Sequence, residues 1–240
     1  MGELTAGRPK CLVELGGQPL LHWQIDALQA AGIEKIGIVA GWHKEQLRGY
    51  GTTLFENARW AETNMVVSLA CATTWLQGNT CVVSYSDIFY APRAVSALLA
   101  LDAGIAITYD RDWLALWSRR FSQPMSDAET FEVDDRGYLT DIGRRAASLD
   151  QISGQYMGLL RFTPDGWHEV LRFLSEISGD ERDRLDMTTL LRHLIARGVR
   201  IATAPIDCRW GEVDSTSDLA LYERDIAAGL LTPPRPAGTQ

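Results

Sequence analysis

A lysine close to the start of the chain, Lys10, is a candidate ligand for phosphate groups. It follows Arg8 and Pro9, and the proline ring restricts the backbone directly before the lysine. An ammonium group held there could neutralise the charge of a triphosphate or of a leaving pyrophosphate. Judged alone, however, a lysine in such a stretch is more often a solvated surface charge.

Two acidic segments further along the chain have the chemistry of magnesium ligands. Asp87 follows an apolar run that is predicted to be a buried strand, and metal ligands of α/β proteins often follow such strands. Glu212 and Asp214 are two residues apart, so on a strand they point to the same side. A structural role is the alternative, because aspartates also cap helices and turns. Asp87 suits both roles equally, and Asp214 or Ser215 could begin the last helix.

Together these charged residues make a stronger case than any of them alone. Mg²⁺ is commonly held by one or two carboxylates, while phosphate oxygens and water complete its six ligands. One lysine and a few carboxylates, brought together from distant segments, would suit a metal-bound nucleoside triphosphate. Lys10, Asp87 and Asp214 have that chemistry, and Glu212 is a further candidate metal ligand.

The elements that must position these residues alternate between strands and helices. Predicted strands cover residues 35–40, 80–85, 104–109 and 200–204, and predicted helices cover residues 19–31, 65–76, 92–101, 166–177 and 187–197. This alternation predicts a layered α/β fold with a mixed, mostly parallel sheet. Ligands of such sheets bind beyond the carboxyl ends of the strands, which is where Asp87 falls.

Residues 110–162 are predicted to form a small antiparallel insertion. The segments 129–133 and 138–142 read as two strands of a β-hairpin, joined by a turn at Asp134-Asp135-Arg136-Gly137. Residues 155–162 are predicted to be a further strand. We expect this insertion to cover the carboxyl edge of the sheet.

Composition and charge narrow the class of protein. The chain has 240 residues, 46% of them hydrophobic, which suits a single domain over residues 1–231 with a disordered tail at 232–240. The net charge of −8 argues against a nucleic-acid partner but not against a nucleotide substrate. Neither a membrane-spanning run nor a signal peptide is recognisable, which favours a cytoplasmic protein without membrane contacts. Four cysteines without CxxC spacing are predicted to be reduced packing residues.

Several short motifs occur in an order that resembles a known superfamily. They are Arg8-Pro9-Lys10, Val39-Ala40-Gly41-Trp42, the Asn-Met-Val-Val-Ser-Leu stretch from Asn64, Ser86-Asp87 and Glu212-Val213-Asp214-Ser215. The chain is similar to the nucleotidyltransferases that activate phosphorylated sugars and phosphocholine. The similarity is greatest to the bacterial phosphocholine and phosphonate cytidylyltransferases, and it runs from about Gly2 to Glu223. It implies a Rossmann-like, three-layer α/β/α nucleotidyltransferase fold.

This resemblance also implies a reaction. The chain would transfer a nucleotidyl group, CMP from CTP, to a phosphorylated or phosphonylated small molecule of the phosphocholine or aminoethylphosphonate type. Pyrophosphate would leave, and Mg²⁺ would be the cofactor. A sugar-1-phosphate nucleotidyltransferase and a catalytically inactive nucleotide-binding homologue are the alternatives. The partners would be an NTP and a small acceptor, and a homo-oligomer is compatible with the sequence.

Site residues can be carried over from the family position by position. The residues matching the family's Mg²⁺-binding acids are Asp87 and Asp214, and the matching lysine, Lys10, would contact phosphate. The implied nucleotide-binding residues are Arg8, Lys10, Gly41, Asn64, Ser68 and Ser86. Family members also carry a strand and a Gly-rich phosphate loop before Arg-Pro-Lys. Since only residues 1–6 stand there, we expect that strand and most of the loop to be missing, either through a start upstream of Met1 or through truncation.

Aromatic and acidic residues predict the acceptor side of the site. A quaternary ammonium prefers the face of Trp or Tyr, and a nearby acid adds a counter-charge. Each aromatic residue alone is more often a core residue, and a sugar would compete, because Trp also stacks on sugar rings. The predicted acceptor-binding residues are Asp112, Trp113, Trp117, Tyr156, Asp186 and Trp210. By contrast, the pairs Arg119-Arg120 and Arg144-Arg145 are interpreted as solvated.

Overall fold

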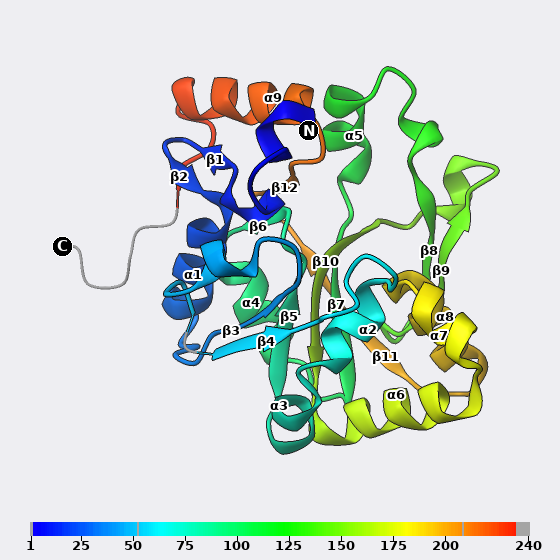
Figure 1. The fold of residues 1–240 in the computed structure, drawn as a ribbon. Helices are drawn as coiled ribbons and strands as arrows, with labels where there is room; N and C mark the ends of the chain where they lie inside the picture. The colour runs from blue at the N-terminus through cyan, green and yellow to red at the C-terminus, as the bar shows by residue number, and fades with distance from the viewer. Residues whose placement is uncertain (1, 52, 208, 234–240) are drawn as a thin grey trace.

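The chain folds around a central sheet whose strands are ordered β11-β7-β10-β5 (Figure 1), in a computed structural model that describes residues 2–51, 53–207 and 209–233. Strand β11 (Ile201–Ile206) pairs in parallel with β7 (Ile105–Asp110). Strand β10 (Gln155–Phe162) is antiparallel to both β7 and β5 (Cys81–Ser84). Three of the four strands therefore run in one direction, but only one of the three pairings, that of β11 with β7, is parallel. The prediction of a mixed sheet is confirmed, whereas the expectation that it is mostly parallel is wrong.

The position of β10 corrects the predicted limits of the insertion. Residues 155–162 do not belong to an antiparallel element above the sheet but lie in its middle, between β7 and β5. Seven of the eight residues of β10 are buried. A strand that is covered on both faces reads as a nearly continuous apolar run, whereas a hairpin strand would alternate with polar residues. The hairpin itself is confirmed, with β8 (Glu129–Val133) paired to β9 (Leu139–Arg145).

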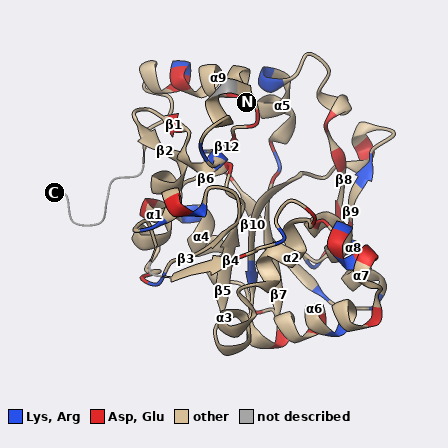
Figure 2. Ribbon diagram, viewed as in Figure 1, with Lys and Arg blue, Asp and Glu red and all other residues tan. Residues whose placement is uncertain are grey.

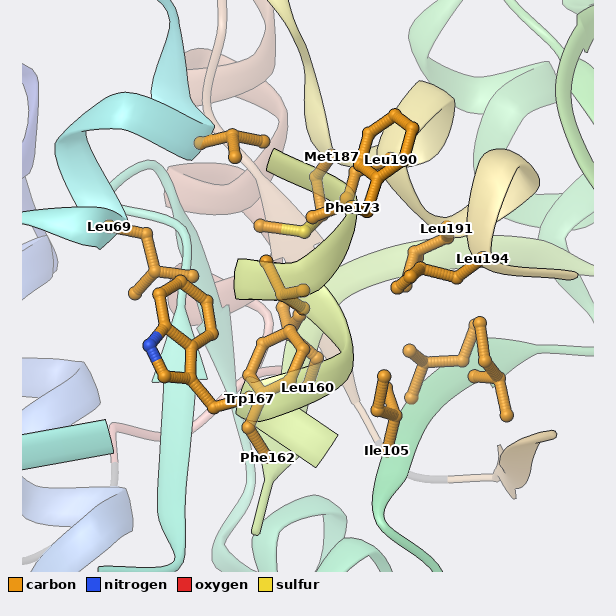
Figure 3. Packing of buried hydrophobic residues seen from close by; sticks show 14 of the residues in the cluster. Leu69, Ile105, Leu160, Phe162, Trp167, Phe173, Met187, Leu190, Leu191 and Leu194 are labelled. Atoms are coloured by element: carbon orange, nitrogen blue, oxygen red, sulfur yellow. The ribbon is translucent and has the colours of Figure 1, made fainter. Parts of the chain in front are cut away.

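Helices cover both faces of the central sheet and give the fold three layers. On one face, α2 (Met65–Ala70), α3 (Thr73–Gly78), α6 (Pro164–Glu176) and α8 (Met187–Ala196) contribute to one hydrophobic cluster. Figure 3 shows this cluster, in which Trp167 packs close to Phe162. The helix predicted over residues 65–76 is thus divided into two short ones.

The opposite face is covered by a second hydrophobic cluster. Helices α1 (Leu20–Ala30), α4 (Pro92–Leu99) and α5 (Trp113–Arg120) supply it. Along β7, Ile105 and Ile107 join the first cluster and Ala106 joins the second, as expected from the alternating side chains of a strand.

Smaller elements complete the fold around these layers. Besides the β8–β9 hairpin, three further pairs of strands lie outside the central sheet. They are β1 (Glu14–Leu15) with β2 (Gln18–Pro19), β3 (Gly37–Ala40) with β4 (Thr53–Glu56), and β6 (Ile88–Tyr90) with β12 (Trp210–Glu212). The remaining helices are α7 (Gly179–Arg184), α9 (Thr216–Ala227) and the 3₁₀ turns η1 (Gly2–Thr5), η2 (Lys10–Leu12), η3 (Lys44–Leu47), η4 (Pro124–Ser126) and η5 (Leu149–Gln151).

Some predictions fall outside the part of the chain that the structure describes. Most of the predicted tail, residues 234–240, and one of the four cysteines, Cys208, belong there. The other three cysteines, Cys11, Cys71 and Cys81, are free thiols. Within the described residues, none of the helices has both the length and the apolar character that a membrane crossing requires.

Candidate active site

A short antiparallel ladder brings the two acidic segments together. Strand β6 starts directly after Asp87, and β12 ends at Glu212, which faces Ile88 across the ladder. The backbone N–H of Val213 donates a hydrogen bond to the carbonyl oxygen of Asp87 at 2.9 Å. As a result, Asp87 lies beside Glu212 and Asp214, although the two segments are far apart in the sequence.

Asp87, Glu212 and Asp214 form a carboxylate triad, because one ligand oxygen from each lies within 4.8 Å of the other two. Lys10 contacts this triad from the N-terminal segment. Its Nζ donates to Asp87 Oδ2 at 2.8 Å and also contacts Asp214 Oδ1. Acidic and basic residues accordingly meet where the N-terminal segment passes β6 and β12 (Figure 2). The structure thus brings together all four residues that were predicted to hold metal and phosphate.

The position of Lys10 follows from the turn that carries it. Turn η2 buries Cys11 and Leu12, the two residues after the lysine, and only 28% of the lysine side chain is exposed. Burial by itself would lower the pKa of Lys10, but the charges and hydrogen bonds of Asp87 and Asp214 raise it above its usual value. Lys10 is therefore a charged member of the site rather than a solvated surface lysine.

The electrostatics of the triad favour a divalent cation. Burial raises the pKa of Glu212 to about 8, and repulsion from Asp214 and Asp87 adds to this effect. For Asp214, burial also acts to raise the pKa, but the hydrogen bond and charge of Lys10 lower it. Asp87 Oδ1 is buried and has no hydrogen-bond partner among the described residues. Crowded carboxylates and an unpartnered buried oxygen fit the oxygen ligands that Mg²⁺ prefers.

Arg120, in the last turn of α5, also contacts the triad. Its side chain is 0% exposed, so the prediction of a solvated arginine is wrong. Nη1 lies 3.0 Å from Glu212 Oε2 and Nη2 lies 3.2 Å from Asp214 Oδ2. The error arose because α5 was not expected as a helix. The last turn of this helix directs the arginine toward β12 instead of toward solvent.

The residues predicted to bind the nucleotide lie in two groups. Arg8 and Ser86 are exposed and stand close to Lys10 and Asp87 in the chain. Gly41 follows β3 and lies so close to Trp60 that a side chain at this position would collide with the indole. Their contact with a nucleotide stays a prediction.

Asn64 and Ser68, which were also predicted to bind the nucleotide, have structural partners. Asn64 Oδ1 accepts from the N–H of Met65 at 2.7 Å and begins α2, while its Nδ2 donates to the carbonyl oxygen of Arg184 at 3.1 Å. Ser68 Oγ accepts from Asn57 Nδ2 at 3.0 Å. These contacts connect the segment around α2 to α7, and a nucleotide role for either residue stays a prediction.

Three predicted acceptor-binding residues are core residues instead. Trp113 and Trp117 are each 4% exposed and Trp210 is 6% exposed, all within the second hydrophobic cluster. Trp210 Nε1 donates to Asp110 Oδ2 at 2.8 Å. Because protein atoms cover these rings, the prediction that they offer their faces to an acceptor is corrected. Trp113 and Trp117 are one helical turn apart on α5, and this spacing turns both toward the sheet.

The other predicted acceptor residues are more accessible. Asp112 is exposed at the start of α5, and Tyr156 is half-buried with its ring edge-on to Tyr85 at 5.8 Å between centroids. Asp186 caps α8, since its Oδ1 accepts from the N–H of Thr189 at 2.7 Å.

Glu129 was not predicted as a site residue from the sequence, but its carboxylate interacts electrostatically with that of Asp186. Glu129 is exposed, but partial desolvation raises its pKa, repulsion from Asp186 and Asp127 raises it further, and the charge of Arg192 acts to lower it. Asp186 and Glu129 thus contribute negative charge to the same region. Nothing in the sequence around Glu129, the first residue of a hairpin strand, distinguishes it from a solvated glutamate.

Comparisons with known proteins agree with this geometry. Residues 1–144 match the family described as the MobA-like NTP transferase domain. The chain is 32% identical over 232 residues to the CTP:phosphoglutamine cytidylyltransferase of Campylobacter jejuni, covering 90% of this chain and 91% of that protein. It is 24% identical over 236 residues to the 2-aminoethylphosphonate cytidylyltransferase of Lancefieldella rimae, covering 93% and 87%.

A solved structure shares the fold. The CTP:phosphocholine cytidylyltransferase from Streptococcus pneumoniae superimposes with a TM-score of 0.70 at 20% sequence identity, covering 94% of this chain and 93% of that one. The predicted fold class is thereby confirmed.

Proposed function

The chain belongs to the MobA-like NTP transferase family and is a nucleotidyltransferase, and we propose that it transfers CMP from CTP to a small phosphorylated or phosphonylated amine. The observation that carries this proposal is the Lys10 ammonium group, which contacts Asp87 and Asp214 within the carboxylate triad. Two relatives support the choice of CTP, because both are named as cytidylyltransferases. Their named acceptors, phosphoglutamine and 2-aminoethylphosphonate, both contain phosphorus and nitrogen.

In this reaction, an acceptor oxygen attacks the α-phosphorus of CTP. A new P–O bond forms, the bond from the α-phosphorus to the bridging oxygen breaks, and pyrophosphate leaves with the electron pair. A phosphate monoester or a free phosphonate is already largely ionised near neutral pH, since the second pKa of a phosphate monoester is about 6. The acceptor therefore needs no general base, and the task of the protein is alignment and charge neutralisation.

The residues of the site divide this task between them. Asp87, Asp214 and Glu212 would hold Mg²⁺, which when bound neutralises phosphate charge and orients substrate oxygens. Lys10 would offset the charge that develops on pyrophosphate as it leaves. Its flexible stem suits a group that exchanges a carboxylate partner for a phosphate partner.

Negative charge on the acceptor side favours an amine. Asp186 lies near enough to Glu129 for charge repulsion between them to raise the pKa of Glu129. A positively charged nitrogen on the acceptor would relieve that repulsion. Tyr156 and Tyr85 add aromatic surface beside it. A hexose 1-phosphate carries no cation to balance these acids, which makes a sugar the weaker candidate.

A panel assay tests the proposal. Pyrophosphate release is measured with each of four NTPs against phosphocholine, 2-aminoethylphosphonate, phosphoglutamine and hexose 1-phosphates, in the presence of Mg²⁺. We expect turnover with CTP and an amine-bearing acceptor, and none when Mg²⁺ is removed with a chelator. Faster turnover with a hexose 1-phosphate would support the sugar alternative. An inactive protein with every pair would support the catalytically inactive homologue.

A further inference from the structure

Arg120 occupies a fixed position at the end of α5. Its guanidinium carbon lies 5.2 Å from the ring centroid of Trp117 and 5.0 Å from that of Phe121. With no part of the side chain exposed, the two aromatic rings leave the guanidinium few alternative positions. The group remains charged, because contacts with acidic partners raise the pKa of Arg120 even though burial acts to lower it.

The nitrogens of this guanidinium contact three carboxylates, and Nη2 contacts both Asp214 and Asp218. Besides the contacts of Nη1 with Glu212 and of Nη2 with Asp214, Nε donates to Asp218 Oδ1 at 3.0 Å. Asp218 is itself buried, and its Oδ2 accepts from the N–H groups of Asp214 at 3.1 Å and Ser215 at 3.0 Å. Arg120 and Asp218 together therefore support the segment that carries Asp214.

Asp214 is shared between two cations. Its Oδ2 contacts Arg120, whereas its Oδ1 contacts Lys10, which also binds Asp87. Since a carboxylate is planar, a rigid contact to Oδ2 also determines the direction of Oδ1. The arginine thus turns one oxygen of Asp214 toward Asp87.

We propose that Arg120 is the positioning residue of the carboxylate triad. It holds Glu212 and Asp214 in the orientation in which they bind a divalent cation together with Asp87. This role rests on the proposed Mg²⁺-dependent transfer, but it concerns metal binding and not the chemical step. The neighbouring Arg119 offers a matched comparison, because it is exposed and pairs with Asp225 on α9.

The test measures binding of Mn²⁺ alone to the substrate-free protein, followed by the electron paramagnetic resonance signal of free Mn²⁺. Arg120→Lys is the informative variant, because it keeps the positive charge but lacks the planar fork that reaches three carboxylates. A change in affinity then reports orientation and not net charge. We expect Arg120→Lys to weaken Mn²⁺ binding by about tenfold or more. Arg119→Lys should bind Mn²⁺ like the wild type.

Thermal unfolding shows whether the variant is folded. If Arg120→Lys does not unfold cooperatively, Asp218→Asn is used instead, since it weakens the contacts with Arg120 and removes none of the three triad carboxylates, while the asparagine oxygen can still accept from the N–H groups of Asp214 and Ser215. Weaker Mn²⁺ binding in that variant supports the role of Arg120. Wild-type Mn²⁺ affinity in a folded variant at either position would overturn it, as would a wild-type protein that does not bind Mn²⁺.

The panel assay separates this inference from the proposed function. Loss of Mn²⁺ affinity in Arg120→Lys, alongside a wild type that is inactive with every NTP and acceptor, would refute the proposed reaction and support the positioning role. Active wild-type protein together with unchanged Mn²⁺ affinity in Arg120→Lys would refute only the positioning role.

Discussion

The two cations beside the carboxylate triad are held in very different ways. Lys10 lies on a short turn, keeps 28% of its side chain exposed and contacts Asp87 and Asp214 through a single ammonium group. The Arg120 side chain is completely buried, lies against the rings of Trp117 and Phe121, and contacts three carboxylates. An ammonium on a flexible stem can change partners, whereas a stacked guanidinium keeps the partners it has. Asp214, which contacts both cations, thus has one exchangeable and one permanent counter-charge.

The largest loss of activity is expected when either of the two acids that Lys10 contacts is replaced. Asp87→Ala and Asp214→Ala should each reduce kcat by more than about 10³-fold, because the metal-binding oxygens are lost. Pyrophosphate release measures this, with Asp135→Ala as the control, since Asp135 is exposed at the tip of the β8–β9 hairpin. Near-normal turnover in a folded Asp87 or Asp214 variant would show that the triad is not the catalytic centre.

Arg120 should matter more for stability than Lys10 does. Arg120→Met leaves Asp218 and Glu212 without their buried cation, which should cost about 3–5 kcal/mol in the free energy of unfolding. Lys10→Met should change it by less than about 1 kcal/mol, because its ion pairs are partly solvated. Urea unfolding of the two variants measures the difference. Equal losses would mean that the two cations are held alike.

Lys10→Met should separate catalysis from metal binding. We expect kcat to fall by about 10²-fold, because charge on the leaving pyrophosphate is no longer offset. Mn²⁺ binding to the substrate-free protein should become tighter, since an ammonium group no longer competes for Asp87 and Asp214. This change is opposite in sign to that expected for Arg120→Lys. Weaker Mn²⁺ binding would show that the lysine does not compete with the metal.

The final prediction concerns the pH dependence of stability. The pKa of Glu212 is raised from 4.5 to about 8 on folding, mainly by burial, so between these values the folded protein binds a proton that the unfolded chain releases. The contribution of Glu212 to stability is therefore fully present below pH 4.5 and is lost as the pH rises through about 8. Chelator-treated protein should show this decline in urea unfolding, and Glu212→Gln should reduce it. A pH profile that is identical in the two proteins would contradict the assignment.

The sequence was sufficient to predict the acids of the triad. Asp87 ends an apolar run, and the spacing of Glu212 and Asp214 indicates a shared face, so residue type and strand position both pointed to the site. The ladder of β6 and β12 that joins them could not be predicted, because each strand has only three residues.

The region around α5 shows why the roles of the other site residues could not be predicted from the sequence. Trp113 and Trp117 have the spacing of a helix face, yet the same aromatic residues also suit a ligand site, and only packing against the sheet separates the two. The position of the Arg120 side chain depends on that packing, because its partners Asp218 and Glu212 lie about a hundred positions away in the sequence. Likewise, the apolar run of β10 indicates a strand but not its place between β7 and β5.

The contact between Lys10 and Asp214 also has a consequence for the order of folding. The two residues are 204 positions apart, and Arg120 lies 98 positions before Asp218. Closing such long loops carries an entropic cost that slows folding, so the site should be among the last parts to form. During synthesis, Lys10, Asp87 and Arg120 all leave the ribosome before β12 exists. Every nascent chain therefore passes through a stage in which Lys10 and Arg120 are present and two of the three triad acids, Glu212 and Asp214, are not.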